Sequence, residues 1–242
     1  MAHQYSIPEL DRASLGETVV IRDAEARHAA TVSRVRVGER LAVSNGRGVR
    51  AAGVVRSVSA QRVELVIDEL SQEAEARPRL WLVQALAKGG RDELAIQAAT
   101  ELGVSVVVPW QAARSVSRWD GKAEKGRARW QSIVDEAAKQ SLRSFTPEVW
   151  PLHSTAELAE LSVKAQLVLC VPEAEQSIRE LRLDDRDLAL IVGPEGGIAP
   201  EEIERLVRAG AQCVRLGPEV LRTSTAGPAA LAALSLHLGR WG

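Results

Sequence analysis

The sequence predicts an α/β protein: a parallel sheet flanked by helices, preceded by a smaller β domain. Residues 80–86 form a short apolar run, residues 92–102 follow with helical periodicity, and residues 104–108 are again apolar. Strand, helix and strand in that order form a βαβ unit, which requires the two strands to be parallel. A second buried strand, at residues 188–192, ends in a glycine-rich turn followed by a helix start. Residues 1–72 contain only short, valine-rich, roughly alternating segments, which favour a separate β structure.

The N-terminal part is expected to be a small β-barrel covering residues 1–72. Its expected strands lie at residues 18–21, 40–44, 50–58 and 62–68, with Asn45-Gly46 as a hairpin signal and one short helix over residues 24–32. Residues 71–79 are polar and contain a proline, which suits a linker. The second domain is therefore expected to cover residues 78–242.

Composition limits the class of protein but does not name a partner. The chain has 242 residues, a hydrophobic content of 45% and a net charge of -1, so its overall charge does not indicate a polyanion partner. Cys170 and Cys213 lie in predicted strands without metal-ligand spacing, so we expect reduced thiols and no metal site. No signal pattern and no apolar run of about 18 residues is present, which predicts a cytoplasmic protein.

The chain is organised around residues 188–226. The turn Gly193-Pro194-Glu195-Gly196-Gly197 leaves main-chain N–H groups accessible, and the helix after it is expected to begin at Pro200 and end at Gly210. A second strand, at residues 213–216, ends in Gly217-Pro218. Because ligands bind outside the carboxyl ends of parallel strands, the two turns predict one shared pocket. A single glycine-rich turn of this kind has a purely structural role about as often as it binds a ligand. The dinucleotide-binding pattern G-x-G-x-x-G and the phosphate-binding pattern G-K-[ST] are both missing from the sequence.

The combination of GPEGG, a helix and LGPEVLRTSTA resembles the C-terminal signature of the SPOUT methyltransferases, in particular the bacterial 16S rRNA (uracil-N3) methyltransferase family. Residues 84–110 and the segment from His28 to Gly38, which fits H-x-x-x-V-x-R-x-x-x-G, resemble the same family. The resemblance implies a SPOUT-type sheet with a C-terminal trefoil knot and a PUA-like barrel that guides RNA. His28 itself has an equally good interpretation as a half-buried structural histidine.

The resemblance also implies S-adenosylmethionine as cofactor, a homodimer, and methylation of a uridine at N3 in the decoding region of 16S rRNA in the small ribosomal subunit. Another rRNA or tRNA position, or a non-catalytic RNA-binding protein, are the alternatives. The implied cofactor site combines the glycine loops with apolar walls and the exit of the strand over residues 166–171. Its expected members are Cys170, Val171, Pro172, Ile191, Gly193, Pro194, Gly196, Gly197, Leu216, Gly217, Leu221, Thr223 and Thr225.

Methylation at uracil N3 requires either a base that removes the proton or a cation that stabilises the uracil anion. Glu195 is the candidate base or orienting acceptor, and Arg143 or Arg222 the candidate cation. Glu195 can equally be a carboxylate that closes the turn by accepting loop N–H groups. None of these roles needs a metal ion.

RNA contacts are expected from local basic clusters, because the net charge is close to zero. Between Trp110 and Phe145 the chain has eight Lys and Arg against four Asp and Glu. The candidate RNA-binding residues are Arg34, Arg36, Lys88 and Arg114, with solvated side chains as the common alternative. Arg34 and Arg36 share a face if that segment is extended. The family pattern E-Q-[SC]-G-R has Lys139 and Leu142 at its first and fourth positions here.

The remaining expected elements complete the second domain. A helix from about residue 122 has Trp130, Ile133, Val134, Ala137, Ala138 and Ser141 on its inward side. Residues 147–151 suit an edge strand, residues 155–161 a helix capped by Ser154 or Thr155, and residues 175–183 a crossover helix. In the helix over residues 92–102, Leu94 is expected to face inward. The Ala/Leu helix over residues 225–238 is apolar around more than one stripe, which suits a dimer interface or burial within one chain.

Overall fold

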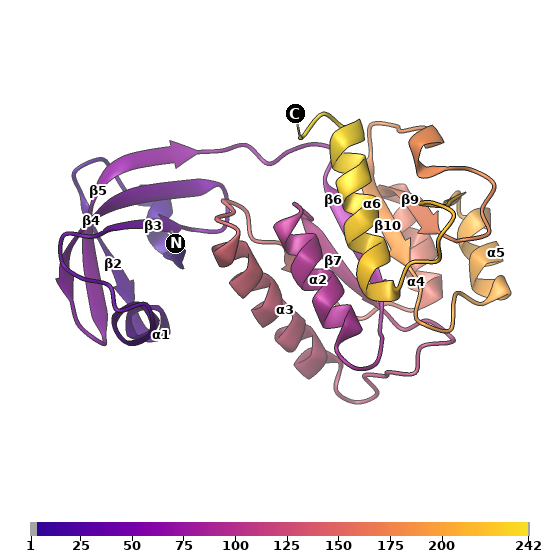
Figure 1. Ribbon diagram of the computed structural model, residues 1–242, viewed down its shortest axis with the longest axis horizontal. Coiled ribbons are helices and arrows are strands. Elements are labelled where there is room, and N and C mark those ends of the chain that lie inside the picture. The colour runs from indigo at the N-terminus through magenta and orange to yellow at the C-terminus, as the bar shows by residue number, and fades with distance from the viewer. Residues whose placement is uncertain (1–3, 242) are drawn as a thin grey trace. The chain divides into compact units, whose positions relative to one another are not determined.

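The computed structural model describes residues 4–241 and divides into two compact units (Figure 1). The first unit comprises the chain up to Glu75 together with Ala138–Thr146, and the second comprises Ala76–Ala137 and the chain from Pro147 onward. Within the described residues, no helix combines the length and apolar character needed to cross a bilayer.

A five-stranded sheet forms the first unit. Its strands are β1 (Gln4–Ser6), β2 (Thr18–Arg22), β3 (Arg40–Ser44), β4 (Val49–Val58) and β5 (Arg62–Gln72), in the order β1-β3-β4-β5-β2. Only β1 pairs in parallel, with β3. The long β4–β5 ladder shifts register at Gly53, where a Cβ would overlap the carbonyl of Val66, so a glycine is needed at this bulge and the sheet can curl. The expected strands and the hairpin are confirmed.

The short helices of this unit correct one expectation about its arginines. A 3-10 turn (Pro8–Arg12) follows β1, and α1 (Asp23–Arg27) continues as a π-turn (His28–Val32). Arg34 has a φ of +53°, in the left-handed region, so the segment is not extended and Arg34 and Arg36 do not alternate as strand residues do. Both are nevertheless exposed, on either side of the buried Val35. His28 is half-buried and lies edge-on to Tyr5.

Residues Ala138–Thr146 join the first unit through specific contacts. Lys139 Nζ lies 2.8 Å from Glu25 Oε1, and the carbonyl of Arg143 accepts a hydrogen bond of 2.7 Å from Gln4 Nε2. Leu142 has a φ of +55°. A left-handed backbone favours glycine, which accounts for the glycine of the family pattern at this position. The first departure, Lys139, forms an ion pair with Glu25.

The second unit is built on a six-stranded, wholly parallel sheet. Its strands are β6 (Leu80–Ala85), β7 (Val106–Trp110), β8 (Glu148–Val149), β9 (Ala165–Cys170), β10 (Asp187–Val192) and β11 (Gln212–Val214), in the order β11-β9-β10-β6-β7-β8. The short β8 lies at one edge, as expected for residues 147–151. The carboxyl ends of all six strands therefore meet at one edge of the sheet.

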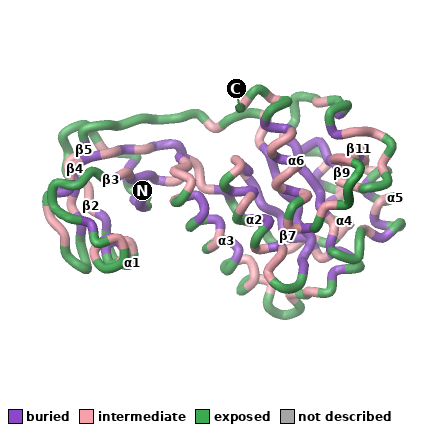
Figure 2. The backbone as a smooth tube through the Cα atoms, in the orientation of Figure 1, coloured by how far each residue is buried: buried purple, intermediate pink, exposed green. Residues whose placement is uncertain are grey.

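Helices cover both faces of this sheet. The first face is covered by α2 (Arg91–Glu101), α3 (Ala123–Gln140) and α6 (Thr223–His237), and the second by α4 (Thr155–Glu160) and α5 (Pro200–Arg208). Along β6, Leu80 and Leu82 pack on the first face while Trp81 and Val83 pack on the second, so the strand is buried on both sides (Figure 2). The expected fold class, a PUA-like β domain before a parallel α/β domain, is confirmed, while the threading of a trefoil knot stays a prediction.

Several local expectations are corrected. The prediction of a crossover helix over residues 175–183 is wrong, because only a 3-10 turn (Ile178–Glu180) forms there. The main chain of this segment is engaged by the exit of β11 instead, because Arg215 N donates to Gln176 O and Ile178 N donates to Arg215 O, each at 2.9 Å. Leu94 is 59% exposed, so it does not face inward. Of the inward stripe of α3, Ile133 is partly buried and Ser141 lies beyond the helix end. Ser154, not Thr155, caps α4.

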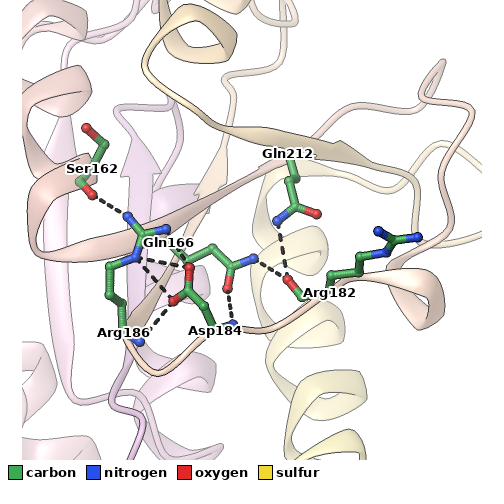
Figure 3. A network of polar contacts seen from close by, with 6 residues as sticks. All are labelled: Ser162, Gln166, Arg182, Asp184, Arg186 and Gln212. Atoms are coloured by element: carbon green, nitrogen blue, oxygen red, sulfur yellow. Dashed lines mark hydrogen bonds and ion pairs between the residues drawn. The ribbon is translucent and has the colours of Figure 1, made fainter.

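A polar network holds the chain between this turn and β10 (Figure 3). Gln166 donates to the carbonyl of Arg182 at 2.5 Å and accepts from the N–H of Asp184 at 3.2 Å, and Gln212 donates to the same Arg182 carbonyl. Arg186 pairs with Asp184. Side chains from β9 and β11 thus bind the backbone of the segment that precedes β10. These hydrogen bonds satisfy backbone N–H and C=O groups that a helix would have paired internally.

Candidate functional site

A cavity of about 670 Å³ lies where β9, β10 and β11 end. Three strand exits line it: residues 170–173 after β9, residues 192–198 after β10 and residues 214–223 after β11. The two glycine-bearing turns at Gly193 and Gly217 therefore share one cavity, as the sequence predicts. Volumes of about 300–1,000 Å³ are usual for sites that bind small molecules and cofactors.

Bare main chain forms the wall that follows β10. A Cβ on Gly193 would lie 2.5 Å from Ile198 Cγ1, so only glycine allows the loop to fold back here. Gly197 has a φ of +73°, and its N–H donates to Pro194 O at 2.9 Å, which closes a tight turn. Pro200 begins α5 and Gly210 follows its end with a φ of +95°, both as expected.

The hydroxyl of Thr223 joins three elements at the base of the cavity. It accepts a hydrogen bond from Gln84 Nε2 at 2.8 Å and donates to the carbonyl of Gly193 at 2.7 Å. Gln84 is fully buried near the end of β6, and Thr223 is the first residue of α6. Both roles of the hydroxyl are thus used inside the protein, so Thr223 positions the glycine loop.

Glu195 connects the glycine turn to the loop after β6. Its Oε1 accepts from the N–H of Lys88 at 3.2 Å and lies 2.9 Å from Arg91 Nη1. Partial burial raises the pKa of Glu195, but hydrogen bonds from its own N–H, from Arg91 and from Lys88 outweigh this and leave the pKa below its ordinary value. A carboxylate with a lowered pKa is a weak general base, so the geometry favours the turn-closing interpretation of Glu195.

A second carboxylate, Glu202, fixes the start of α5; the sequence indicates it only as a first-turn carboxylate and gives it no role in the site. Glu202 is 8% exposed; it accepts from Thr155 Oγ1 at 2.6 Å and from the N–H of Ala113 at 3.0 Å. It also accepts from the N–H of Ala199 at 3.2 Å. A single buried carboxylate thereby joins the loop after β7, α4 and α5, and satisfied buried networks of this kind stiffen a site.

The cavity carries charges of both signs. Arg91, Arg114 and Arg222 line it together with Glu173, Glu195 and Glu219. Arg114 Nη1 donates to the carbonyl of Gly196 at 3.3 Å, and Arg222 is exposed. The lining residues that sequence reasoning missed include Arg91, Ile198 and Val220. Arg91 lies inside the matched segment AKGGRDE, which could have pointed to it.

The remaining predicted residues divide clearly. All expected cofactor-site residues line the cavity except Ile191, which is fully buried in the core, and Thr225, which is exposed outside it. Lys88 lines a separate, smaller cavity. Arg143 belongs to the first unit, as do Arg34 and Arg36, and none of these three lines either cavity.

The two cysteines are unpaired with each other. Burial raises the pKa of the Cys170 thiol to about 12, and it also raises the pKa of Cys213. Cys170 therefore lines the cavity as a neutral, weakly polar thiol and not as a nucleophile.

Comparisons with known proteins agree with this geometry. A model of the RNA methyltransferase domain family matches residues 74–235, and one of the RNA methyltransferase PUA domain matches residues 21–68. The ribosomal RNA small subunit methyltransferase E of Mycobacterium tuberculosis is 41% identical over 233 residues, covering 93% of this chain and 89% of the relative. The chain belongs to the ribosomal RNA small subunit methyltransferase E family. The member from Bacillus subtilis is 34% identical over 90% of both chains.

Solved structures of the family share the whole fold. The Neisseria gonorrhoeae member bound to S-adenosyl methionine has a TM-score of 0.88 at 30% identity and covers 98% of both chains. A methyltransferase from Legionella pneumophila in complex with SAM has a TM-score of 0.86 at 28% identity, again over 98% of both chains. The family predicted from GPEGG and the LRT segment is thus confirmed.

Proposed function

We propose that this protein methylates N3 of a uridine in the decoding region of 16S rRNA, with S-adenosylmethionine as methyl donor. The observation that carries the proposal is that the exits of β9, β10 and β11 enclose one cavity of about 670 Å³. Relatives 41% and 34% identical are ribosomal RNA small subunit methyltransferases, and two related structures hold the cofactor.

The cavity suits an adenosyl group because it combines bare main chain with apolar walls. Gly193, Gly196, Gly197 and Gly217 present backbone donors and acceptors, while Leu216 and Leu221 supply apolar surface. Cys170, Val171, Pro172 and Pro194 complete the candidate site, and Thr223 positions its glycine loop. When bound, the cofactor supplies an electrophilic methyl group.

The residues of this chain have to bind the uracil and stabilise the anion that remains when its N3 proton passes to solvent water. We propose Arg222 as the stabilising cation, because it lines the cavity and is exposed toward solvent. Glu195 keeps the glycine turn closed against Lys88 and Arg91. Arg143, the other cation expected from the sequence, stays a prediction.

We further propose a division of labour between the domains expected at residues 1–72 and 78–242. The N-terminal domain would bind RNA through exposed arginines such as Arg34 and Arg36, and Lys88 and Arg114 would contact the strand near the cavity. Because bacterial ribosomal RNA lies in the cytoplasm, we propose that this protein works there.

A homodimer is part of the proposal. Although α6 buries Ala230, Leu231 and Leu234 in its own unit, Leu236 is 62% exposed and Trp241 42% exposed. Apolar side chains of this size near the end of a helix suit a second copy of the chain. Light scattering at micromolar concentration tests this, and a monomer would contradict a dimeric assembly.

The decisive experiment for the function is methylation mapping on ribosomal RNA from a deletion strain. We expect one 3-methyluridine near the decoding centre to be lost and then restored by the wild-type gene. Loss of a methyl group at another position would contradict the assigned target. Calorimetry with S-adenosylmethionine separates an enzyme from a non-catalytic RNA-binding protein, because only the enzyme needs the cofactor.

A further inference from the structure

A second cavity of about 360 Å³ lies in the same unit, between the loop after β6 and the chain that leads from β7 to α3. The loop Lys88-Gly89-Gly90 and the start of α2 form one wall, and the chain from Val116 to Trp119 forms another. The residues Gly126, Arg129 and Trp130 of α3 complete it. Of these residues, sequence reasoning assigned a role in binding only to Lys88.

This cavity is the neighbour of the candidate cofactor cavity along one sheet edge. The chain after β6 and the chain after β7 each contribute to both cavities: Arg91 and Arg114 line the larger one, while Gly90, Asp92 and Val116 line the smaller one. Glu195 bridges them, because it accepts from the N–H of Lys88, which lines the smaller cavity, and pairs with Arg91, which lines the larger one.

The aromatic wall of the smaller cavity is held in place by the helix behind it. A Cβ on Gly126 would overlap the indole of Trp119, so the glycine lets this ring pack directly on α3. Trp119 also meets Trp130 edge-on, with ring centroids 5.0 Å apart, and it remains half-buried. Tryptophan is the only abundant aromatic residue of the chain, and a fixed, partly exposed indole is a suitable face for stacking a base.

The polar groups of the cavity are ordered as well. Arg129 forms a bidentate ion pair with Glu93, which holds the pKa of that carboxyl below its usual range. Asp92 is buried and accepts from the N–H groups of Ala87 at 3.0 Å and Glu93 at 2.9 Å. The guanidinium and the glycine backbone can offer N–H groups to carbonyl oxygens such as those of uracil.

We propose that this second cavity receives the target pyrimidine base after it leaves its RNA stack, with Trp119 as the stacking face and Val116 at the entrance. The N3 edge of the base would face the larger cavity, which Arg222 lines. The inference rests on the proposed function, since methyl transfer requires the target atom beside the cofactor. Enzymes that modify a base have to extract it from the stack and hold it in a pocket. The volume of the cavity is sufficient for one base but not for a stretch of helix.

The first test is Val116→Asp, because Val116 is 67% exposed and its replacement leaves the core intact. The matched control is Val163→Asp, at a position 81% exposed that lines neither cavity. We expect Val116→Asp to lower kcat/KM for methylation of a 16S rRNA fragment at least tenfold, with the Kd for S-adenosylmethionine and the Tm unchanged. Equal kcat/KM for the two variants would overturn the proposal. If the wild-type protein neither binds the cofactor nor methylates the fragment, the proposed function itself is wrong.

The second test reads binding without turnover. A 16S rRNA fragment transcribed with 4-thiouridine is irradiated on the wild-type protein with cofactor present, and the crosslinked peptide is identified by mass spectrometry. We expect crosslinks in residues 116–130, reduced several-fold by Trp119→Leu and retained by Trp119→Phe, which keeps an aromatic face. Crosslinks confined to the first unit, or equal yields from both variants, would contradict a base in this cavity.

Discussion

Thr223 offers a sharp test of how the glycine loop is positioned. Its buried hydroxyl bonds to both Gln84 Nε2 and the carbonyl of Gly193. Thr223→Val keeps the shape of the side chain and removes both bonds, which leaves the Gly193 carbonyl unpaired and Gln84 Nε2 with only the carbonyl of Ala85. Gln84 Nε2 keeps one acceptor, so one polar group loses its partner, and at about 1–3 kcal/mol for such a group we expect the free energy of unfolding to fall by about 1–3 kcal/mol.

Thr223→Val should also weaken cofactor binding. Gly193 lines the cavity, and the hydrogen bond from the Thr223 hydroxyl to the Gly193 carbonyl holds this part of the wall in place. We expect the Kd for S-adenosylmethionine, measured by calorimetry, to rise about tenfold, which corresponds to roughly 1.4 kcal/mol. Urea denaturation gives the stability. Thr223→Ser is the control, since it keeps the hydroxyl and loses one methyl group at about 1 kcal/mol. If Thr223→Val matched the wild type in stability and affinity, the positioning role would be refuted.

Three further predictions follow from contacts described above. Glu195→Gln retains an oxygen that accepts from Lys88 and Arg91, so the single-turnover rate of methylation at saturating cofactor should stay within about threefold of the wild-type rate. A rate lower by roughly 10²-fold or more would instead show that Glu195 acts as the general base. Asp187 is bound by Arg77 and Arg79, and although burial raises its pKa, these bonds leave it below the ordinary value. The contribution of the Asp187 carboxylate to the free energy of unfolding is therefore complete above about pH 4 and is lost as the pH falls below that. Asp187→Asn should lower the free energy of unfolding, measured in urea, by about 1–3 kcal/mol at pH 7 and by much less near pH 2. A loss of stability that did not depend on pH would contradict the ionic origin. Leu142→Gly should be neutral or stabilise by up to about 1 kcal/mol because φ is +55°, whereas Leu94→Gly in α2 should cost about 1 kcal/mol; equal losses would contradict the strain.

The sequence predicted the parts of the site that depend on local patterns. Strand ends, the helix start at Pro200 and the glycine turns are encoded within a few residues, so the exits of β10 and β11 could be placed beforehand. The crossover helix could not be excluded locally, because Ile178 and Leu181 recur at helical spacing and both are buried. What prevents the helix is backbone pairing with Arg215, a residue more than thirty positions later.

The supporting residues of the site escaped prediction for the same reason. Gln84 is the one polar residue in the apolar run of β6, and that anomaly could have been noticed, but its partner Thr223 lies at the other end of the domain. Glu202 has the position of an ordinary first-turn carboxylate. Its hydrogen bonds to Thr155 and Ala113 exist only once three separate loops meet.

The membership of Ala138–Thr146 in the first unit determines how this protein can be divided. The polypeptide passes from one unit to the other, returns, and leaves again, so no single cut yields two self-sufficient pieces. A fragment beginning at Pro78 would carry Lys139 without Glu25, and the Arg143 carbonyl without Gln4. A C-terminal fragment therefore contains a nine-residue segment whose partners are missing, and we expect its replacement by a short glycine linker to improve the stability of such a fragment.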